Sequence, residues 1–228
     1  MSGLRINDKD IVVPGEELAD GMDYLPSYGT YRDNEKIISS LYGLVNISGR
    51  VIRIVALRGK YIPKVSDVVI GRIRNVGFSG WSVDVGYAYD ANLSMKDASS
   101  EYIERSSDLS QYYAIDDIIV AKVVNVTKSK FIDVTLKGPG LKKLKDGRII
   151  EVTPSKVPRI IGKQGSMISM IKTACNCDII VGQNGKIWIY GKPEDEMLAI
   201  DVINMVDREA HREGLTDKIK GYLEKKKK

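Results

Sequence analysis

Two glycines that flank a Lys-Gln dipeptide, Gly162-Lys163-Gln164-Gly165, constrain the fold more than any other feature of this sequence. Residues without a Cβ let the chain turn sharply, so we expect the tetrapeptide to join two short helices. Pro158 suits a first helical turn, and the Asn184-Gly185 step favours a tight hairpin. The predicted order is strand, helix, helix, strand, strand, helix, with elements near 147–153, 155–161, 166–174, 178–181, 186–190 and 194–210.

The loop between the two predicted helices has the chemistry to hold a phosphate chain. No Cβ keeps a backbone away from the glycines, and the second helix presents N–H groups and a positive dipole end. Residues 141–165 contain seven Lys or Arg and two acidic residues. The pattern predicts a type I KH domain (β-α-α-β-β-α) over 141–210, which clamps about four nucleotides of single-stranded RNA. Its candidate RNA-binding residues are Arg159, Ile160, Ile161, Gly162, Lys163, Gln164 and Gly165. The alternative is an ordinary helix-turn-helix corner, in which the glycines only make the bend.

Five short strand patterns are evenly spaced between residues 65 and 137. They lie at 68–76, 81–85, 88–93, 118–126 and 131–136, and a polar, acidic insert at 96–117 separates the third from the fourth. Five such strands in a small domain predict an OB-type barrel. Residues 1–64 are also β-rich, with a plausible hairpin at 46–49, and residues 211–228 form a basic tail with a short amphipathic helix. The predicted fold class is therefore multidomain, mainly β plus α+β.

The barrel sequence resembles the S-one (S1) version of the OB-fold, in which an aromatic and basic face holds single-stranded RNA. Arg72 and Arg74 are two residues apart and share a strand face. Phe78 and Trp81 are candidates for base stacking, and three lysines could complete a basic groove: Lys122, Lys128 and Lys130. For Trp81 the alternative is that it fills the barrel core.

No pattern for catalysis or metal binding emerges. The chain has one histidine, His211, and its two cysteines, Cys175 and Cys177, are too close to staple a fold and lack a second ligand pair. The adjacent acids Asp116 and Asp117 are expected to point to opposite faces of a strand end. We therefore expect no catalytic residue, no metal, no cofactor and no small-molecule substrate. Residues 1–10 lack a signal-peptide pattern and no stretch could span a bilayer, so we expect a cytoplasmic protein without membrane contact.

With these motifs in view, the chain resembles the S-one/KH cap subunits of the archaeal exosome across residues 10–210. The resemblance extends to the first zone through Val12-Val13-Pro14-Gly15-Glu16, Gly29-Thr30-Tyr31 and Arg58-Gly59-Lys60-Tyr61-Ile62-Pro63. Such caps sit as three copies on a six-membered phosphorolytic ring, with the N-terminal domain docked on the ring and the RNA-binding domains around the pore. The resemblance thus implies a non-catalytic subunit that recruits and threads single-stranded RNA for a 3′–5′ exoribonuclease ring.

Other classes remain open on sequence alone. A transcription elongation or termination factor that binds nascent RNA can share the S-one and KH order, but it usually carries two KH units, whereas a single Gly-x-x-Gly helix pair stands here. A purely structural adaptor would keep the fold without needing basic residues at the Gly-x-x-Gly loop.

Overall fold

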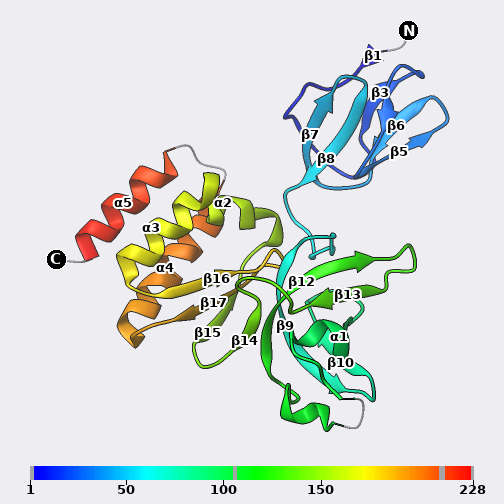
Figure 1. Cartoon of the computed structure of the whole chain (residues 1–228). Helices are drawn as coiled ribbons and strands as arrows, with labels where there is room; N and C mark the ends of the chain where they lie inside the picture. The colour runs from blue at the N-terminus through cyan, green and yellow to red at the C-terminus, as the bar shows by residue number, and fades with distance from the viewer. Residues whose placement is uncertain (1–2, 105–106, 211–213, 227–228) are drawn as a thin grey trace. The chain divides into compact units, whose positions relative to one another are not determined.

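The computed structural model describes residues 3–104, 107–210 and 214–226 and divides the chain into two units, 1–59 and 60–228. Figure 1 follows the chain from the β-rich N-terminal unit through the barrel to the helices of the C-terminal domain. The multidomain fold class predicted from the sequence is confirmed. His211 lies outside the described residues.

The N-terminal unit consists of two four-stranded sheets around a small aliphatic core. One sheet has the order β1 (Gly3–Leu4), β3 (Glu17–Asp20), β6 (Lys36–Ser39) and β5 (Thr30–Asp33). The other has the order β2 (Ile11–Val12), β7 (Gly43–Ser48), β8 (Val51–Ala56) and β4 (Leu25–Pro26). The β7–β8 hairpin turns at Gly49 and Arg50, at the end of the predicted connector 46–49, and the φ of +60° at Gly49 suits a residue without a Cβ. Strand alternation buries the core side chains Val12, Leu18, Ile37, Val45, Ile52 and Ile54.

A closed five-stranded barrel follows in the second unit. Its strands are β9 (Val68–Val76), β10 (Gly80–Asp84), β11 (Ala91–Ser94), β12 (Ile118–Val126) and β13 (Ile132–Thr135). They pair in the order β13-β11-β10-β9-β12, and β12 pairs with β13 to close the barrel. The insert carries α1 (Met95–Ala98) and a 3-10 turn at Leu109–Gln111. Tyr61 belongs to the barrel core although the sequence pattern had placed it in the preceding connector, and its hydroxyl donates to Asp67 Oδ2 at 2.7 Å. Burial and the Asp67 carboxylate raise the Tyr61 pKa, which keeps this donor protonated.

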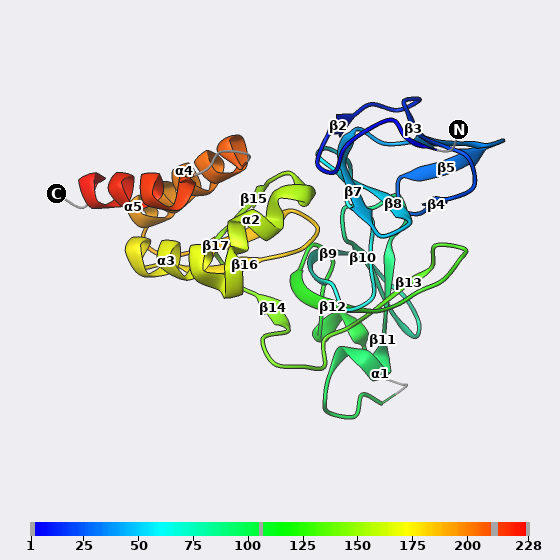
Figure 2. The same cartoon turned by 90° about the horizontal axis from the view of Figure 1, so that it is seen from above.

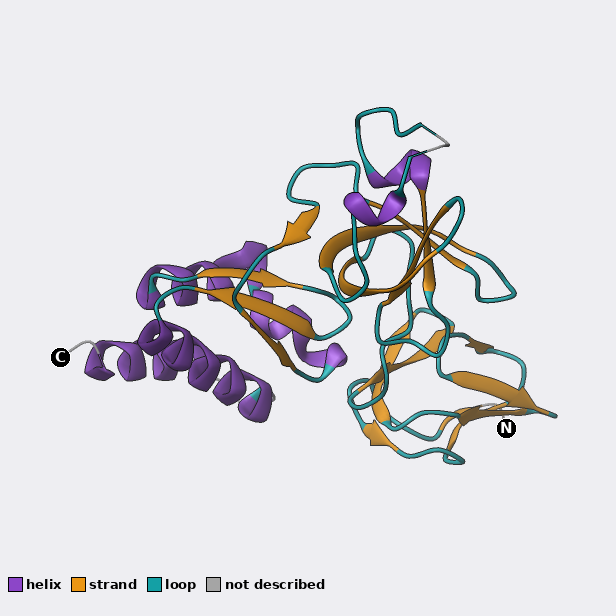
Figure 3. Ribbon diagram, turned by 90° about the horizontal axis from the view of Figure 1, so that it is seen from below, coloured by secondary structure: helices purple, strands orange, loops and turns teal. Residues whose placement is uncertain are grey.

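The C-terminal domain is a three-stranded sheet covered by helices. The strands β15 (Arg148–Glu151), β17 (Lys186–Tyr190) and β16 (Asp178–Val181) lie in that order, all antiparallel. After a 3-10 turn at Pro154–Lys156, the helices are α2 (Val157–Ile161), α3 (Ser166–Cys175), α4 (Pro193–Glu209) and α5 (Leu215–Lys226). Figure 3 shows the helices and strands of this domain by colour. Figure 2 shows α5 near α3 and α4, and its Leu215, Ile219 and Leu223 are part of the same buried core.

The barrel and the C-terminal domain share a buried interface within the second unit. Alternation along β17 sends Ile187 and Ile189 into the helical core, whereas Trp188 packs with Ile70, Val120 and Leu144 of the barrel side. Leu144 lies in β14 (Lys142–Leu144), which pairs with the barrel strand β12 although it falls within the range predicted for the KH domain.

The tip of the β16–β17 hairpin fastens this interface through one buried amide. Asn184 Nδ2 donates to the carbonyl oxygens of Ile70 (2.8 Å) and Val85 (2.9 Å), and Asn184 Oδ1 accepts from the Ile70 N–H at 3.2 Å. Gln183 adds a reciprocal pair with the Val68 backbone, at 2.8 and 3.1 Å. These bonds satisfy backbone groups of β9 and link the hairpin tip to the barrel.

Candidate nucleic-acid interface

The Gly-x-x-Gly loop has a backbone that glycine makes possible. Gly162 has φ +77°, and a Cβ there would lie 2.7 Å from the Met167 backbone nitrogen. Gly165 has φ +78°, and a Cβ there would meet nothing within 4 Å. The first glycine is therefore required by the helix pair itself. The second borders open space, through which another chain could approach the loop.

The charged groups of the loop point to solvent. Lys163 and Gln164 are exposed, and Lys163 makes no ion pair among the residues that the structure describes. Gln164 has φ +52°, which is not a right-handed helical value, so the backbone turns here between α2 and α3. Arg159 is also exposed, at the preceding helix α2. A lysine without an ion pair to any described residue, beside an open glycine and the N-terminus of α3, is suited to a phosphate group.

The apolar residues beside the loop divide into core and surface. Ile161 and Ile168 are half-buried and could border a base. Ile160 is fully buried and packs in the core with Val157, so its predicted role as a base contact is wrong. The sequence spacing explains this burial, because Val157 and Ile160 are three residues apart and lie on the same helix face.

The barrel presents one of the two predicted stacking residues and hides the other. Phe78, between β9 and β10, is 97% exposed. Trp81 is 1% exposed, its ring meets Tyr113 edge-on, and its Nε1–H donates to the Tyr113 carbonyl at 2.9 Å. Stacking of a base on Trp81 is thus wrong for this structure. The sequence pattern indicates this burial. Trp81 and Val83 alternate with Ser82 and Asp84, so both apolar side chains face the core.

The arginines of the barrel face are neutralised by neighbouring acids. Arg74 lies 3.2 Å from Asp84 and 4.0 Å from Asp90, and Arg72 lies 3.5 Å from Asp116. Burial opposes the ionisation of Asp84, but the Gly86 N–H, Arg74 and Lys186 outweigh it and lower its pKa. A strand face whose charges are internally paired offers little attraction to phosphate.

The lysines of the barrel keep their charge available. Lys122, Lys128 and Lys130 are exposed, and none forms an ion pair within the described part of the chain. Phe131 lies in the same loop as Lys128 and Lys130 and is 73% exposed. It is not among the site residues predicted from the sequence, because the pattern predicts a strand over 131–136. Accessible charge on the barrel therefore lies on strand β12, at Lys122, and in the loop that follows it, at Lys128 and Lys130.

The acidic pair at the end of the insert is structural. Asp117 accepts from the Ala114 N–H at 2.7 Å and contacts Lys143, whereas Asp116 faces Arg72. Within the described residues, no three His, Cys, Asp or Glu side chains are grouped as a metal site would need. Cys175 and Cys177 are buried, and burial raises the Cys177 pKa. Over the same residues, no helix is long and apolar enough to cross a membrane.

An S1-type barrel clamped to a KH fold with an open Gly-x-x-Gly loop defines the S1–KH class of proteins. Family models match at three places: a KH domain at residues 147–195, an RRP4 S1 domain at 60–125, and an exosome complex exonuclease RRP4 N-terminal region at 11–48. The chain belongs to the exosome complex component Rrp4 family.

Curated relatives support that assignment along the whole chain. Exosome complex component Rrp4 of Thermococcus kodakarensis is 47% identical over 98% of this chain and 88% of its own length. The protein of the same name from Methanothermus fervidus is 43% identical over 96% of this chain and 97% of its own. That of Methanothermobacter thermautotrophicus is 44% identical over 97% of this chain and 70% of its own. A crystal structure of a presumed exosome complex RNA-binding protein superposes with a TM-score of 0.66 at 34% identity, covering 74% of this chain and 98% of that one.

Proposed function

We propose that this chain is a non-catalytic, cytoplasmic RNA-binding cap subunit of the exosome, which recruits single-stranded RNA and threads it into a phosphorolytic 3′–5′ exoribonuclease ring. The observation that carries the proposal is the Gly-x-x-Gly loop, where Gly165 borders open space and Lys163 is unpaired among the described residues. Family membership supplies the context, because the relatives are named as exosome components. A nascent-RNA-binding transcription factor is not favoured, since each of the relatives compared above carries the Rrp4 name.

The KH loop would be the main contact with RNA, and the barrel surface an additional one. The loop combines an open backbone, a helix N-terminus and a lysine that has no ion pair in the described part of the chain, whereas the Arg72 and Arg74 charges are already matched by acids. Phe78 can stack on a base, and Lys122, Lys128 and Lys130 can contact phosphates without breaking an ion pair. The hydrogen bonds of Asn184 to Ile70 and Val85, here called the Asn184 clamp, link the KH domain to the barrel. Both contacts would therefore act on one RNA strand in a fixed geometry.

The N-terminal unit would dock on the ring. Cross-strand pairing aligns Ile11, Leu44 and Val55 in one row on the outer face of the β2-β7-β8 sheet. Ile11 is 59% exposed and Val55 51% exposed, and Leu44 between them is half-buried. An aliphatic row on an open sheet face is suited to a protein partner, not to RNA. Three caps on a six-membered ring, as the family resemblance implies, would bring three KH loops together and raise the effective affinity for RNA.

The test separates binding from catalysis. The isolated chain is incubated with labelled single-stranded RNA, phosphate and Mg²⁺, and both a mobility shift and RNA length are measured. We expect a shifted, intact RNA. Phosphate-dependent shortening in a preparation free of ring subunits would overturn the non-catalytic assignment. The control matters because the matched N-terminal family is described as part of an exosome complex exonuclease. The absence of any shift at low salt would overturn the RNA-binding assignment.

A further inference from the structure

A groove of about 530 Å³ runs between α3 and α5, on the helical side of the KH domain. Its lining from α3 comprises Ser166, Ser169, Met170, Thr173 and Ala174, and from α5 it comprises Lys220, Leu223 and Glu224. Ser166 follows Gly165 directly, so one end of the groove begins where the Gly-x-x-Gly loop ends.

The α3 wall of the groove carries a row of hydroxyls and no acid. Ser166, Ser169 and Thr173 recur at helical spacing and are exposed, and the only charged residue of α3 is Lys172. Thr173 donates to the Ser169 carbonyl at 3.0 Å, whereas the hydroxyls of Ser166 and Ser169 make no hydrogen bond within the described residues. They are thus available to an outside ligand as donors.

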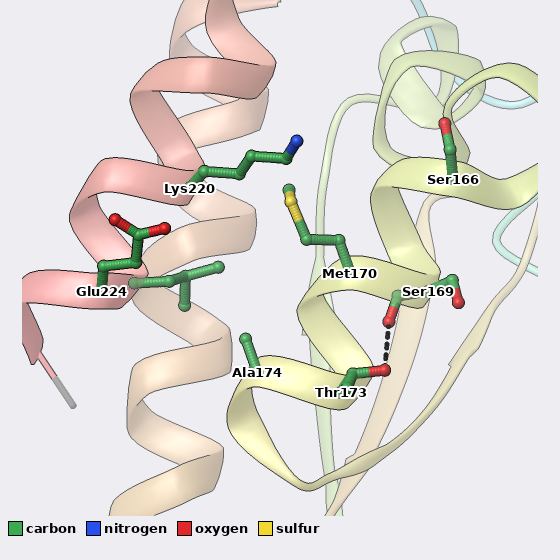
Figure 4. A pocket seen from close by; sticks show the side chains of 8 residues that line it. Ser166, Ser169, Met170, Thr173, Ala174, Lys220 and Glu224 are labelled. Carbon is green, nitrogen blue, oxygen red and sulfur yellow. Dashed lines mark hydrogen bonds between the residues drawn. The ribbon is translucent and has the colours of Figure 1, made fainter.

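The α5 wall contributes a positive charge near the loop end. Figure 4 shows Lys220 reaching from α5 toward Met170 on α3, while Glu224 stays beside its own helix one turn further on. Lys220 is exposed and forms no ion pair in the part of the chain that the structure describes, unlike Lys218, which contacts Glu209 at 2.7 Å. Leu223, the largest aliphatic residue of the lining, is only 3% exposed. Further along the groove the lining is largely apolar, from Met170 and Ala174, and Glu224 adds one negative charge there. At the loop end the exposed groups are hydroxyls and the Lys220 ammonium, which suit the phosphates of an RNA strand.

We propose that the groove between α3 and α5 is a second RNA contact, in which the strand leaving the Gly-x-x-Gly loop continues along α3 with its phosphates on Lys220, Ser166 and Ser169. This inference rests on the proposed RNA-binding function. It extends the bound length beyond the four or so nucleotides that a KH loop clamps. Because the groove lies on one side of the loop, it would serve nucleotides on one side of that core only.

The test compares RNA lengths with the full chain at low salt. The probes are a four-nucleotide RNA and RNAs of about ten nucleotides extended at the 5′ or the 3′ end. Lys220→Ala should weaken binding of one extended RNA by about threefold, the scale of an exposed charge contact, and leave the four-nucleotide RNA unchanged. Ser169→Glu places a negative charge in the groove and should have the larger effect on the same probe. The salt slope for that probe should fall by about 0.7 with Lys220→Ala.

Lys225→Ala is the matched control, because it removes the same charge from an exposed α5 position outside the groove. Equal losses for short and extended RNA, or no loss with either groove variant, would overturn the inference. So would loss of assembly with ring subunits while RNA binding is retained, since the groove would then be a protein contact. A wild-type chain that binds none of the probes would instead overturn the proposed function.

Discussion

At the scale of single residues, exposure decides which side chains are available to RNA. Lys163 and Phe78 face solvent, whereas Ile160 and Trp81 complete two hydrophobic cores. A substitution at an exposed position should therefore change binding without changing stability, and one in a core should do the reverse.

Reversing the charge at the Gly-x-x-Gly loop should weaken RNA binding selectively. Lys163→Asp leaves both glycines in place and puts a carboxylate where a phosphate would lie. We expect affinity for single-stranded RNA to fall at least about tenfold, or about 1.4 kcal/mol, with an unchanged melting temperature. Lys9→Asp makes the same charge change at an exposed position of the N-terminal unit and serves as the control. Equal effects of the two variants would mean that net charge, and not the loop, determines binding.

The two aromatic residues of the barrel should respond in opposite ways. Phe78→Ala should weaken RNA binding by about 1–3 kcal/mol, the usual value of a base stacked on an aromatic ring, and leave unfolding unchanged. Trp81→Ala removes a buried ring and its bond to Tyr113, and should lower the free energy of unfolding by about 3–5 kcal/mol. RNA titrations and denaturant unfolding of both variants measure this. Normal RNA binding by Phe78→Ala would remove it from the interface.

At the scale of elements, the sequence predicts best where a local signal and the tertiary environment agree. Strands β16 and β17 occur at the predicted residues, because the Asn184-Gly185 step marks their turn and each strand is a short, mostly apolar run. The Asn184 clamp could not be predicted from the sequence. The local pattern marks Asn184 only as a turn residue, whereas its side chain bonds residues more than 90 positions away. The pairing of Arg74 with Asp84 was missed for the same reason, as it depends on strand register.

The clamp itself gives a prediction at this scale. Asn184→Ala would leave the Ile70 N–H and the carbonyl oxygens of Ile70 and Val85 without their side-chain partner in a buried site. We expect a loss of about 2–4 kcal/mol in unfolding free energy, on the scale of unsatisfied buried groups. Gln183→Ala, whose bond through the side chain is a single one at 3.1 Å, should cost less. Hydrogen exchange should show faster exchange at Val68 and Ile70, and unchanged exchange there would contradict the role of the clamp.

At the scale of the whole molecule, the two units have different proposed partners, the ring for residues 1–59 and RNA for residues 60–228. The boundary after Gly59 keeps Tyr61 with the barrel core that it helps to fill, and a cut at residue 65 would remove it. A fragment of residues 60–228 should therefore fold and bind RNA as the full chain does when neither is attached to a ring. It lacks the Ile11, Leu44 and Val55 row and should not join one.

The rate at which a reconstituted ring degrades single-stranded RNA tests this division most directly. The ring is assayed alone, with the full chain, with residues 60–228, and with Val55→Asp, using Ser48→Asp at the far end of the same strand pair as the charge control. We expect the full chain and Ser48→Asp to co-elute with the ring and speed degradation, whereas the fragment and Val55→Asp should do neither. Stimulation by the fragment equal to that by the full chain would contradict docking through the N-terminal unit.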